Sequence, residues 1–200
     1  MRRLTCALSE IILEQSFSYT WLGGMMKYTC YHGTQSNFAK IIIKTKSYEP
    51  RGRLKDWLGA GCYFYIEDKQ SAFNFCKCVK RIPEGKIVVL ETLINVDNAY
   101  DLTCKETYAR YKASLCKFRK RLSKQKDAKS YPRILDGHFI NVLEQYLNFD
   151  CIIAMFRDNE KYKTGYSRII NPVLLPETES KKVICVKKIN CIDEDSIKEA

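Results

Sequence analysis

Two short stretches of the chain place glycine beside side chains that can hold a ligand. The first is His32-Gly33-Thr34, which closes an apolar-aromatic run. The second is Gly61-Cys62-Tyr63-Phe64, which follows Gly59. Because glycine has no Cβ, a ligand can approach the backbone there and bond its N–H and C=O groups directly. The imidazole offers a hydrogen-bonding nitrogen and the tyrosine ring a face for stacking.

In this order, with a helical stretch between them, the two motifs resemble those of the ADP-ribosyltransferase superfamily, in its diphtheria-toxin and poly(ADP-ribose)-polymerase-like branch. The resemblance covers residues 28–78 and extends loosely to about residue 192. The run Asp56-Trp57-Leu58-Gly59 ahead of the second motif is more similar to small bacterial members than to the animal polymerases. The resemblance implies a mixed α+β fold of two packed, mainly antiparallel sheets with surrounding helices and a basic helical insertion.

The resemblance also implies a site for NAD as co-substrate. His32 would bond the ribose, Gly33 would bond the carboxamide, and Tyr63 would stack on the nicotinamide ring as a ligand-facing side chain rather than a core support. The two motif strands should be adjacent, with His32 and Tyr63 facing one cleft. The further residues expected to contact NAD are Thr34, Ser71 and either Phe73 or Phe75.

In the family, a glutamate on a later strand bonds the ribose and supports the oxocarbenium-like transition state. Here the matching position, at the start of a strand expected over 183–188, holds Lys182 and Val183. We therefore expect Glu179, in the loop just upstream, to take this role beside His32 and Tyr63. The lack of an acid on the strand argues against poly-chain synthesis and leaves mono-transfer, transfer to nucleic acid or lost activity.

Residues 105–133 carry most of the positive charge of a chain whose net charge is +11. This segment holds eleven Lys or Arg residues against two acidic ones. Leu115, Phe118 and Leu122 recur at helical spacing, which predicts an amphipathic helix. Its basic face suits phosphate contacts, and the aromatic residues among the charges could stack unpaired bases. The residues expected to bind a nucleic-acid acceptor are Lys117, Arg119, Lys120 and Arg121; the alternative is a solvated helix face.

A length of 200 residues fits one domain. We expect an N-terminal extension at 1–24 and a single ADP-ribosyltransferase-like domain at 25–200 that includes the basic helical segment 104–133. Ten cysteines without a secretory signal indicate reduced thiols and a cytoplasmic protein. No stretch is long enough to span a membrane. Cys76-x-Cys78 does not predict a metal site, because residues two apart on a helix do not face each other.

Hydrophobic periodicity and turn residues divide the remaining chain into alternating strands and helices. The expected strands cover 27–31, 57–65, 86–96, 149–156, 167–173 and 183–188, with 167–173 at an edge of the sheet because of Pro172. The expected helices cover 37–44, 67–79, the basic segment, 136–147 and 193–200, with Ser36 as the cap of the first and a turn at 98–102.

These features predict an NAD-dependent mono-ADP-ribosyltransferase that cleaves the nicotinamide–ribose bond. The acceptor would be nucleic acid or a protein that handles it, as for a toxin or phage-defence effector, and a neutralising antitoxin would be a further partner. One alternative on the same fold is an RNA 2′-phosphotransferase, with basic residues of 46–55 around the phosphate. The other is a catalytically degenerate module that binds nucleic acid through the basic segment.

Overall fold

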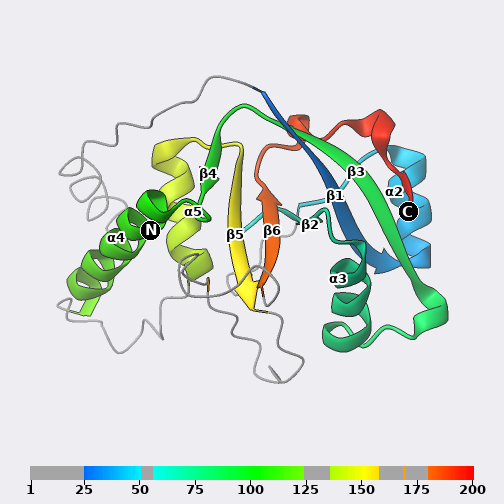
Figure 1. The fold of residues 1–200 in the computed structure, drawn as a ribbon, viewed down its shortest axis with the longest axis horizontal. Helices are drawn as coiled ribbons and strands as arrows, with labels where there is room; N and C mark the ends of the chain where they lie inside the picture. Colours follow the sequence, from blue (N-terminus) through cyan, green and yellow to red (C-terminus); the bar gives the residue numbers. More distant parts are fainter. Residues whose placement is uncertain (1–24, 51–55, 124–135, 158–168, 170–179) are drawn as a thin grey trace.

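A computed structural model describes residues 25–50, 56–123, 136–157, 169 and 180–200. The strands among these residues form one seven-stranded sheet in the order β4-β5-β6-β2-β1-β3-β7 (Figure 1). Only the β4–β5 pair is parallel. The chain is therefore a mixed α+β fold with a mostly antiparallel sheet, as expected. The two separate sheets that we also expected are not seen among the described strands.

The strands are bounded as follows: β1 Met26–Gln35, β2 Cys62–Ile66, β3 Ile87–Val96, β4 Ala99–Asp101, β5 Cys151–Arg157, β6 Ser180–Val186 and β7 Lys198–Glu199. The helices are α2 Ser36–Thr45, α3 Lys69–Asn74, α4 Lys105–Ser123 and α5 Asp136–Leu147. A π-helical turn, Phe75–Val79, extends α3, and single 3₁₀ turns cover Glu84–Lys86, Ile189–Cys191 and Glu194–Ser196.

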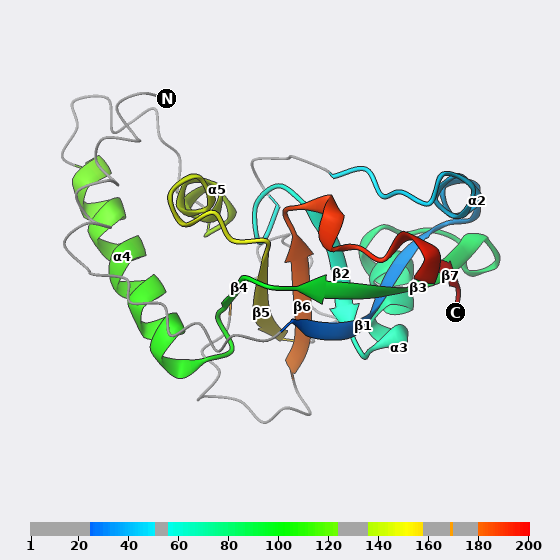
Figure 2. The same cartoon turned by 90° about the horizontal axis from the view of Figure 1, so that it is seen from above.

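The sheet bends where β1 meets β2. These two strands pair only at Cys30↔Ile66 and Tyr31↔Tyr65, whereas β1 pairs with β3 along its whole length. Seen from above, β3 and β1 run across the direction of β5 and β6 (Figure 2). We call the short β1–β2 contact and the divergence beyond it the seam.

Two hydrophobic cores lie on opposite faces of the sheet. Consecutive residues of β6 alternate between them: Val183 and Cys185 belong to one core, and Ile184 and Val186 to the other. The first core packs α4 and α5 against β5 and β6, and we call it the α4–α5 core. The second fills the space between the two halves of the bent sheet and includes residues of α2 and the C-terminal turns, and we call it the inner core.

Several expected elements differ from the observed ones. β1 continues through His32-Gly33-Thr34 to Gln35, and α2 begins at Ser36, so Gln35 rather than Ser36 is the N-cap. The first half of the expected strand 57–65 is a turn, closed by a bond from Gly59 N to Asp56 O of 3.2 Å. The expected terminal helix is instead a 3₁₀ turn followed by β7. The expected extension at 1–24, residues 124–135 of the basic segment and all of the expected strand 167–173 except Ile169 lie outside the described residues.

Candidate functional site

The strands that carry the two sequence motifs are neighbours in the sheet. β1 holds His32, β2 holds Tyr63, and β6 begins one residue after Glu179; the sheet order places β6, β2 and β1 side by side (Figure 1). Glu179 itself lies outside the described residues. The topology thus brings together the strands of the expected catalytic set, and the side chains of His32 and Tyr63 can be followed in detail.

Gly33 presents its backbone at the seam, beyond the last residue pair of β1 and β2. Its carbonyl accepts a hydrogen bond from Lys80 Nζ at 3.1 Å. Since the N–H and C=O of one residue in an antiparallel strand point to the same side, the Gly33 N–H also points toward β2. A Cβ on Gly33 would lie 2.1 Å from the Ala72 carbonyl oxygen. The missing side chain therefore lets α3 pack closely on β1, and a ligand can reach Gly33 only along its N–H and C=O edge.

Three half-buried aromatic rings lie beside this edge. The Phe75 ring centroid is 5.5 Å from that of Trp57 and 6.3 Å from that of Tyr65. The Lys80 ammonium lies 5.3 Å from the Phe75 centroid, within the range of a cation–π contact. We call Gly33, Trp57, Tyr65, Phe75 and Lys80 the seam site. A carbonyl acceptor beside aromatic faces suits a cation or a cationic ring that carries an N–H donor.

His32 bridges the diverging strands through its side chain. Nδ1 lies 2.8 Å from the Tyr63 carbonyl oxygen. Because a carbonyl can only accept, Nδ1 must carry the proton, and Nε2 of the neutral ring is then an acceptor. The ring makes edge contacts with Tyr48 at 5.4 Å and Phe64 at 5.6 Å, both in the inner core. The imidazole thus links β1 to β2 beyond the point where their residue pairing ends.

Tyr63 does not share a cleft with the His32 side chain, contrary to our expectation. Its ring packs against the α4–α5 core, whereas His32 contacts Phe64, the next residue, on the opposite face. The Tyr63 hydroxyl donates to Gly59 O at 2.6 Å and accepts from Leu58 N at 2.8 Å. Burial raises the pKa of this hydroxyl far above its usual range. Tyr63 therefore supports the turn before β2. We had expected its side chain to face a ligand and not to support the core.

Tyr65 is the tyrosine of β2 that lies at the seam site, and the sequence analysis missed it. It follows Tyr63 by two residues, so both project from the same face of β2, and it pairs directly with Tyr31 of β1. Strand alternation, applied to the motif, would have indicated this residue. Trp57 and Lys80 were missed as well. Their contacts with Phe75 depend on the turn at 57–61 and on the π-helical turn, which local patterning does not reveal.

The glycines of the second motif are required by packing rather than by a ligand. Gly61 has a φ of +147°, and a Cβ there would lie 2.5 Å from the Val186 carbonyl oxygen of β6. Gly59 has a φ of +78°, and a Cβ there would lie 2.0 Å from Asn141 Oδ1 of α5. The same Asn141 oxygen accepts from Ala60 N at 2.7 Å. The turn is thus fixed against α5 and β6, and the idea of ligand access at these two glycines is wrong.

The remaining expected NAD contacts lie around α3. Thr34 and Ser71 are buried, and Phe75 belongs to the seam site. Ser71 N donates to Asp68 Oδ1 at 2.8 Å, which makes Asp68 the N-cap of α3. Lys181 Nζ lies 3.1 Å from the other Asp68 oxygen. Burial opposes ionisation of Asp68, but the bonds from Ser71 and the nearby Lys181 outweigh it and lower the pKa of the carboxyl. Asp68 is therefore a fixed carboxylate near the start of α3.

The basic face of α4 lies at the opposite end of the molecule from α3 in both views (Figures 1 and 2). Lys117, Arg119 and Lys120 are exposed and Arg121 is half-buried, while Tyr111, Leu115 and Phe118 on the other side are buried. The helix is thus amphipathic, as expected. Arg119 forms an ion pair with Asp136 of α5 at 3.4 Å.

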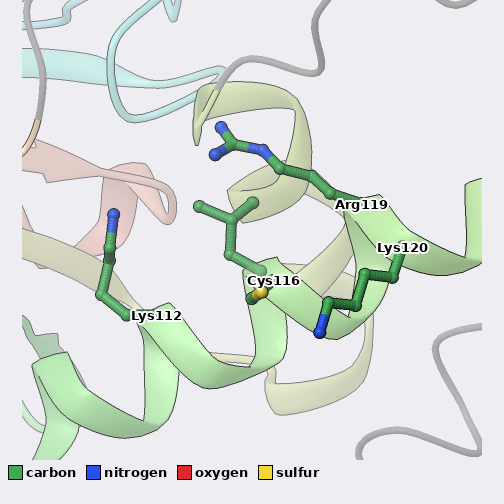
Figure 3. A pocket seen from close by; sticks show the side chains of 5 residues that line it. Lys112, Cys116, Arg119 and Lys120 are labelled. Atoms are coloured by element: carbon green, nitrogen blue, oxygen red, sulfur yellow. The ribbon is translucent and has the colours of Figure 1, made fainter. Parts of the chain in front are cut away.

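A hollow of about 470 Å³ lies on α4, lined by Lys112, Leu115, Cys116, Arg119 and Lys120. Figure 3 shows the Lys112 and Arg119 side chains extending from the same side of the helix. This cationic hollow could take a phosphate group, and it lies on a helix at the opposite end of the molecule from α3 (Figures 1 and 2). An acceptor bound only at α4 would therefore lie away from α3.

The cysteines follow the expected pattern. All those that the structure describes are free thiols, and Cys30, Cys62, Cys76, Cys151, Cys185 and Cys191 are buried. Burial raises the pKa of each of these six thiols. Within the described ranges, no three His, Cys, Asp or Glu side chains could hold a metal ion together. No helix in the same ranges has the length and apolar character needed to cross a membrane.

The seam site therefore combines the buried Gly33 backbone, whose carbonyl accepts from Lys80, with three aromatic rings at the point where the sheet divides. Comparisons of this chain with protein-family models, with curated proteins and with solved structures found no match.

Proposed function

We propose that this chain is an NAD-dependent mono-ADP-ribosyltransferase that binds the nicotinamide half of NAD at the seam site. The observation that carries the proposal is the Gly33 backbone, which points toward β2 beyond the last β1–β2 residue pair and whose carbonyl accepts from Lys80, the residue that lies over the Phe75 ring. A carboxamide needs one acceptor and one donor, and the Gly33 C=O and N–H are such a pair. The nicotinamide ring of NAD is a cation, which suits the faces of the surrounding aromatic rings.

The proposed reaction breaks the bond between the nicotinamide nitrogen and C1′ of the ribose. The electron pair of that bond leaves with nicotinamide, which becomes neutral, and an oxocarbenium-like ribose remains. A nucleophile of the acceptor then bonds to C1′ and releases its proton to the solvent. His32 takes no ribose contact in this proposal, because its ring packs against Tyr48 and Phe64 in the inner core, on the face opposite Tyr65.

A carboxylate would stabilise the positive ribose. Glu179, just before β6, keeps that proposed role, and Asp68 is a carboxylate fixed near α3 among the described residues. The proposed acceptor is nucleic acid or a protein that handles it, in the cytoplasm, as for a toxin or phage-defence effector that an antitoxin neutralises. This setting rests on charge and on analogy with the family that the motifs resemble.

Release of nicotinamide from NAD by the purified full chain tests the proposal. Phe75→Leu keeps an apolar side chain but removes the aromatic face, so we expect nicotinamide release to fall at least about tenfold. Phe38→Leu is the matched control, because Phe38 is 50% exposed on α2 and is not part of the seam site. The proposal fails if wild-type protein releases no more nicotinamide than a blank, or if both variants behave alike.

A second candidate function is nucleic-acid binding through α4 without catalysis. α4 carries seven basic residues and one acidic residue, and it lies at the opposite end of the molecule from α3. One observation favours this candidate: the Tyr63 hydroxyl is bonded to Leu58 N and Gly59 O of the 57–61 turn. The RNA 2′-phosphotransferase alternative gains no such support, because Arg51, Arg53 and Lys55 lie outside the described residues.

Reversing Lys117, Arg119, Lys120 and Arg121 to Glu tests the second candidate. Each lost phosphate contact should flatten the salt dependence of single-strand binding by about 0.7 in the log–log slope. Fluorescence anisotropy over a salt series measures this slope, and nicotinamide release from the same preparation should stay unchanged. Binding equal to wild type would show that the charge is only a solvated helix face.

A further inference from the structure

The Lys80 ammonium makes the two contacts that a nicotinamide ring would need at the seam site. It donates to Gly33 O at 3.1 Å, as the carboxamide N–H would. It also lies 5.3 Å from the centroid of the Phe75 ring, where a cationic ring would be attracted. The ammonium therefore stands in for both the amide donor and the positive charge of the nicotinamide in NAD.

The backbone places Lys80 at this position through an unusual turn. α3 continues as the π-helical turn Phe75–Val79, and Lys80 N donates to Phe75 O at 3.1 Å. This bond spans five residues and returns the chain over Phe75, so the Lys80 side chain starts next to the ring that it covers. At Arg81 the backbone adopts a φ of +55° and leaves the helix. Such π-helical turns occur frequently at functional sites.

We propose that Lys80 is an internal competitor for the nicotinamide subsite and sets its selectivity between NAD and neutral nicotinamide. This inference rests on the proposed function. Any ring that binds Gly33 O must displace the ammonium. The displaced ammonium stays on its side chain near the ring, where it repels the cationic nicotinamide of NAD but not free nicotinamide. Lys80 therefore weakens the binding of NAD more than that of the neutral product.

The test replaces Lys80 with two residues that separate charge from length. Lys80→Met keeps a long side chain without charge or donor, and we expect it to tighten NAD binding about tenfold and nicotinamide binding by less. Lys80→Arg keeps the charge and the donors and should resemble wild type. Lys77→Met is the matched control, because Lys77 lies in the same turn but pairs with Glu84 at 2.6 Å. Calorimetric titration of wild type and the three variants with NAD and with nicotinamide measures a dissociation constant for each pair of protein and ligand.

A second readout does not depend on turnover. Saturating nicotinamide should increase acylation of Lys80 by an amine-reactive reagent, measured by mass spectrometry, while acylation of Lys77 stays constant. If wild type binds NAD but Lys80→Met binds it no tighter, the competitor role is wrong and the proposed function stands. If Lys80→Met binds NAD more weakly, Lys80 is a ligand contact and the inference is overturned. If neither protein binds either ligand, both the inference and the proposed function fall.

Discussion

The Tyr63 hydroxyl should stabilise the fold rather than contact a ligand, and Tyr63→Phe isolates its contribution. The phenylalanine ring keeps the packing against the α4–α5 core but leaves Leu58 N and Gly59 O without the bonds of 2.8 and 2.6 Å. Both residues are buried, with Leu58 at 0% exposure. A buried group left unpaired costs about 1–3 kcal/mol, so we expect the variant to lose about 2–4 kcal/mol in the free energy of unfolding.

Thermal melting followed by circular dichroism measures this loss. For a domain of this length each kcal/mol lowers Tm by about 2–4 °C, so Tm should fall by roughly 5–15 °C. Tyr28→Phe is the control: the Tyr28 hydroxyl reaches Met26 Sδ at 3.2 Å in an exposed position, and its removal should cost at most about 0.5 kcal/mol. Equal melting of both variants and wild type would refute the reasoning and return Tyr63 to the list of candidate ligand contacts.

Three further predictions concern the fold. Gly61→Ala should lower the free energy of unfolding, measured by urea titration, by more than about 3 kcal/mol, because the new Cβ would lie 2.5 Å from a backbone carbonyl oxygen. Gly85→Ala is the control and should leave the stability unchanged, because no atom lies within 4 Å of its Cβ position. Asp68→Ala removes the cap of α3 and should lower the free energy of unfolding by about 1 kcal/mol at pH 7. The pKa of Asp68 in the folded protein lies below the ordinary 3.8, so the difference in stability between wild type and variant should shrink as the pH falls below 3.8. Burial raises the pKa values of Tyr48 and Tyr100 above 10.0, so their contribution to stability is complete below pH 10 and should be lost as the pH rises above it. Urea titrations at several alkaline pH values would contradict the last prediction if the midpoint stayed constant.

Sequence patterning predicts the elements that contain their own signals. α5 runs from Asp136 to Leu147, as its apolar spacing indicates, and β3 begins one residue after the expected start. β4 was missed because its three residues pair with β5, about fifty positions away, while Asp101 and Thr103 make a local turn that the sequence does show. Partners distant in the chain decide such short strands, and local propensity cannot reveal them.

The C-terminal residues show the opposite error. The acidic run at 193–195 is typical of the first turn of a helix, and we expected a helix over 193–200. In the structure this backbone forms hydrogen bonds with β3 instead: Asp193 N donates to Leu93 O and Ala200 N donates to Val89 O, each at 2.9 Å. At the seam, the motifs correctly indicated the strands, but the face on which each tyrosine projects and the position of Lys80 follow from tertiary packing.

The place of β6 in the sheet has a consequence for how the protein is made. β6 is the sixth strand along the chain but lies third in the sheet, between β5 and β2. Until residues 180–186 have left the ribosome, β2 and β5 each expose an unpaired edge, and no residue pair among the described strands joins β4 and β5 to the rest of the sheet. Pairing between strands so distant in sequence is slow, and open edges favour association with other chains. A nascent or truncated chain that stops before residue 180 should therefore depend on chaperones and aggregate when they are scarce.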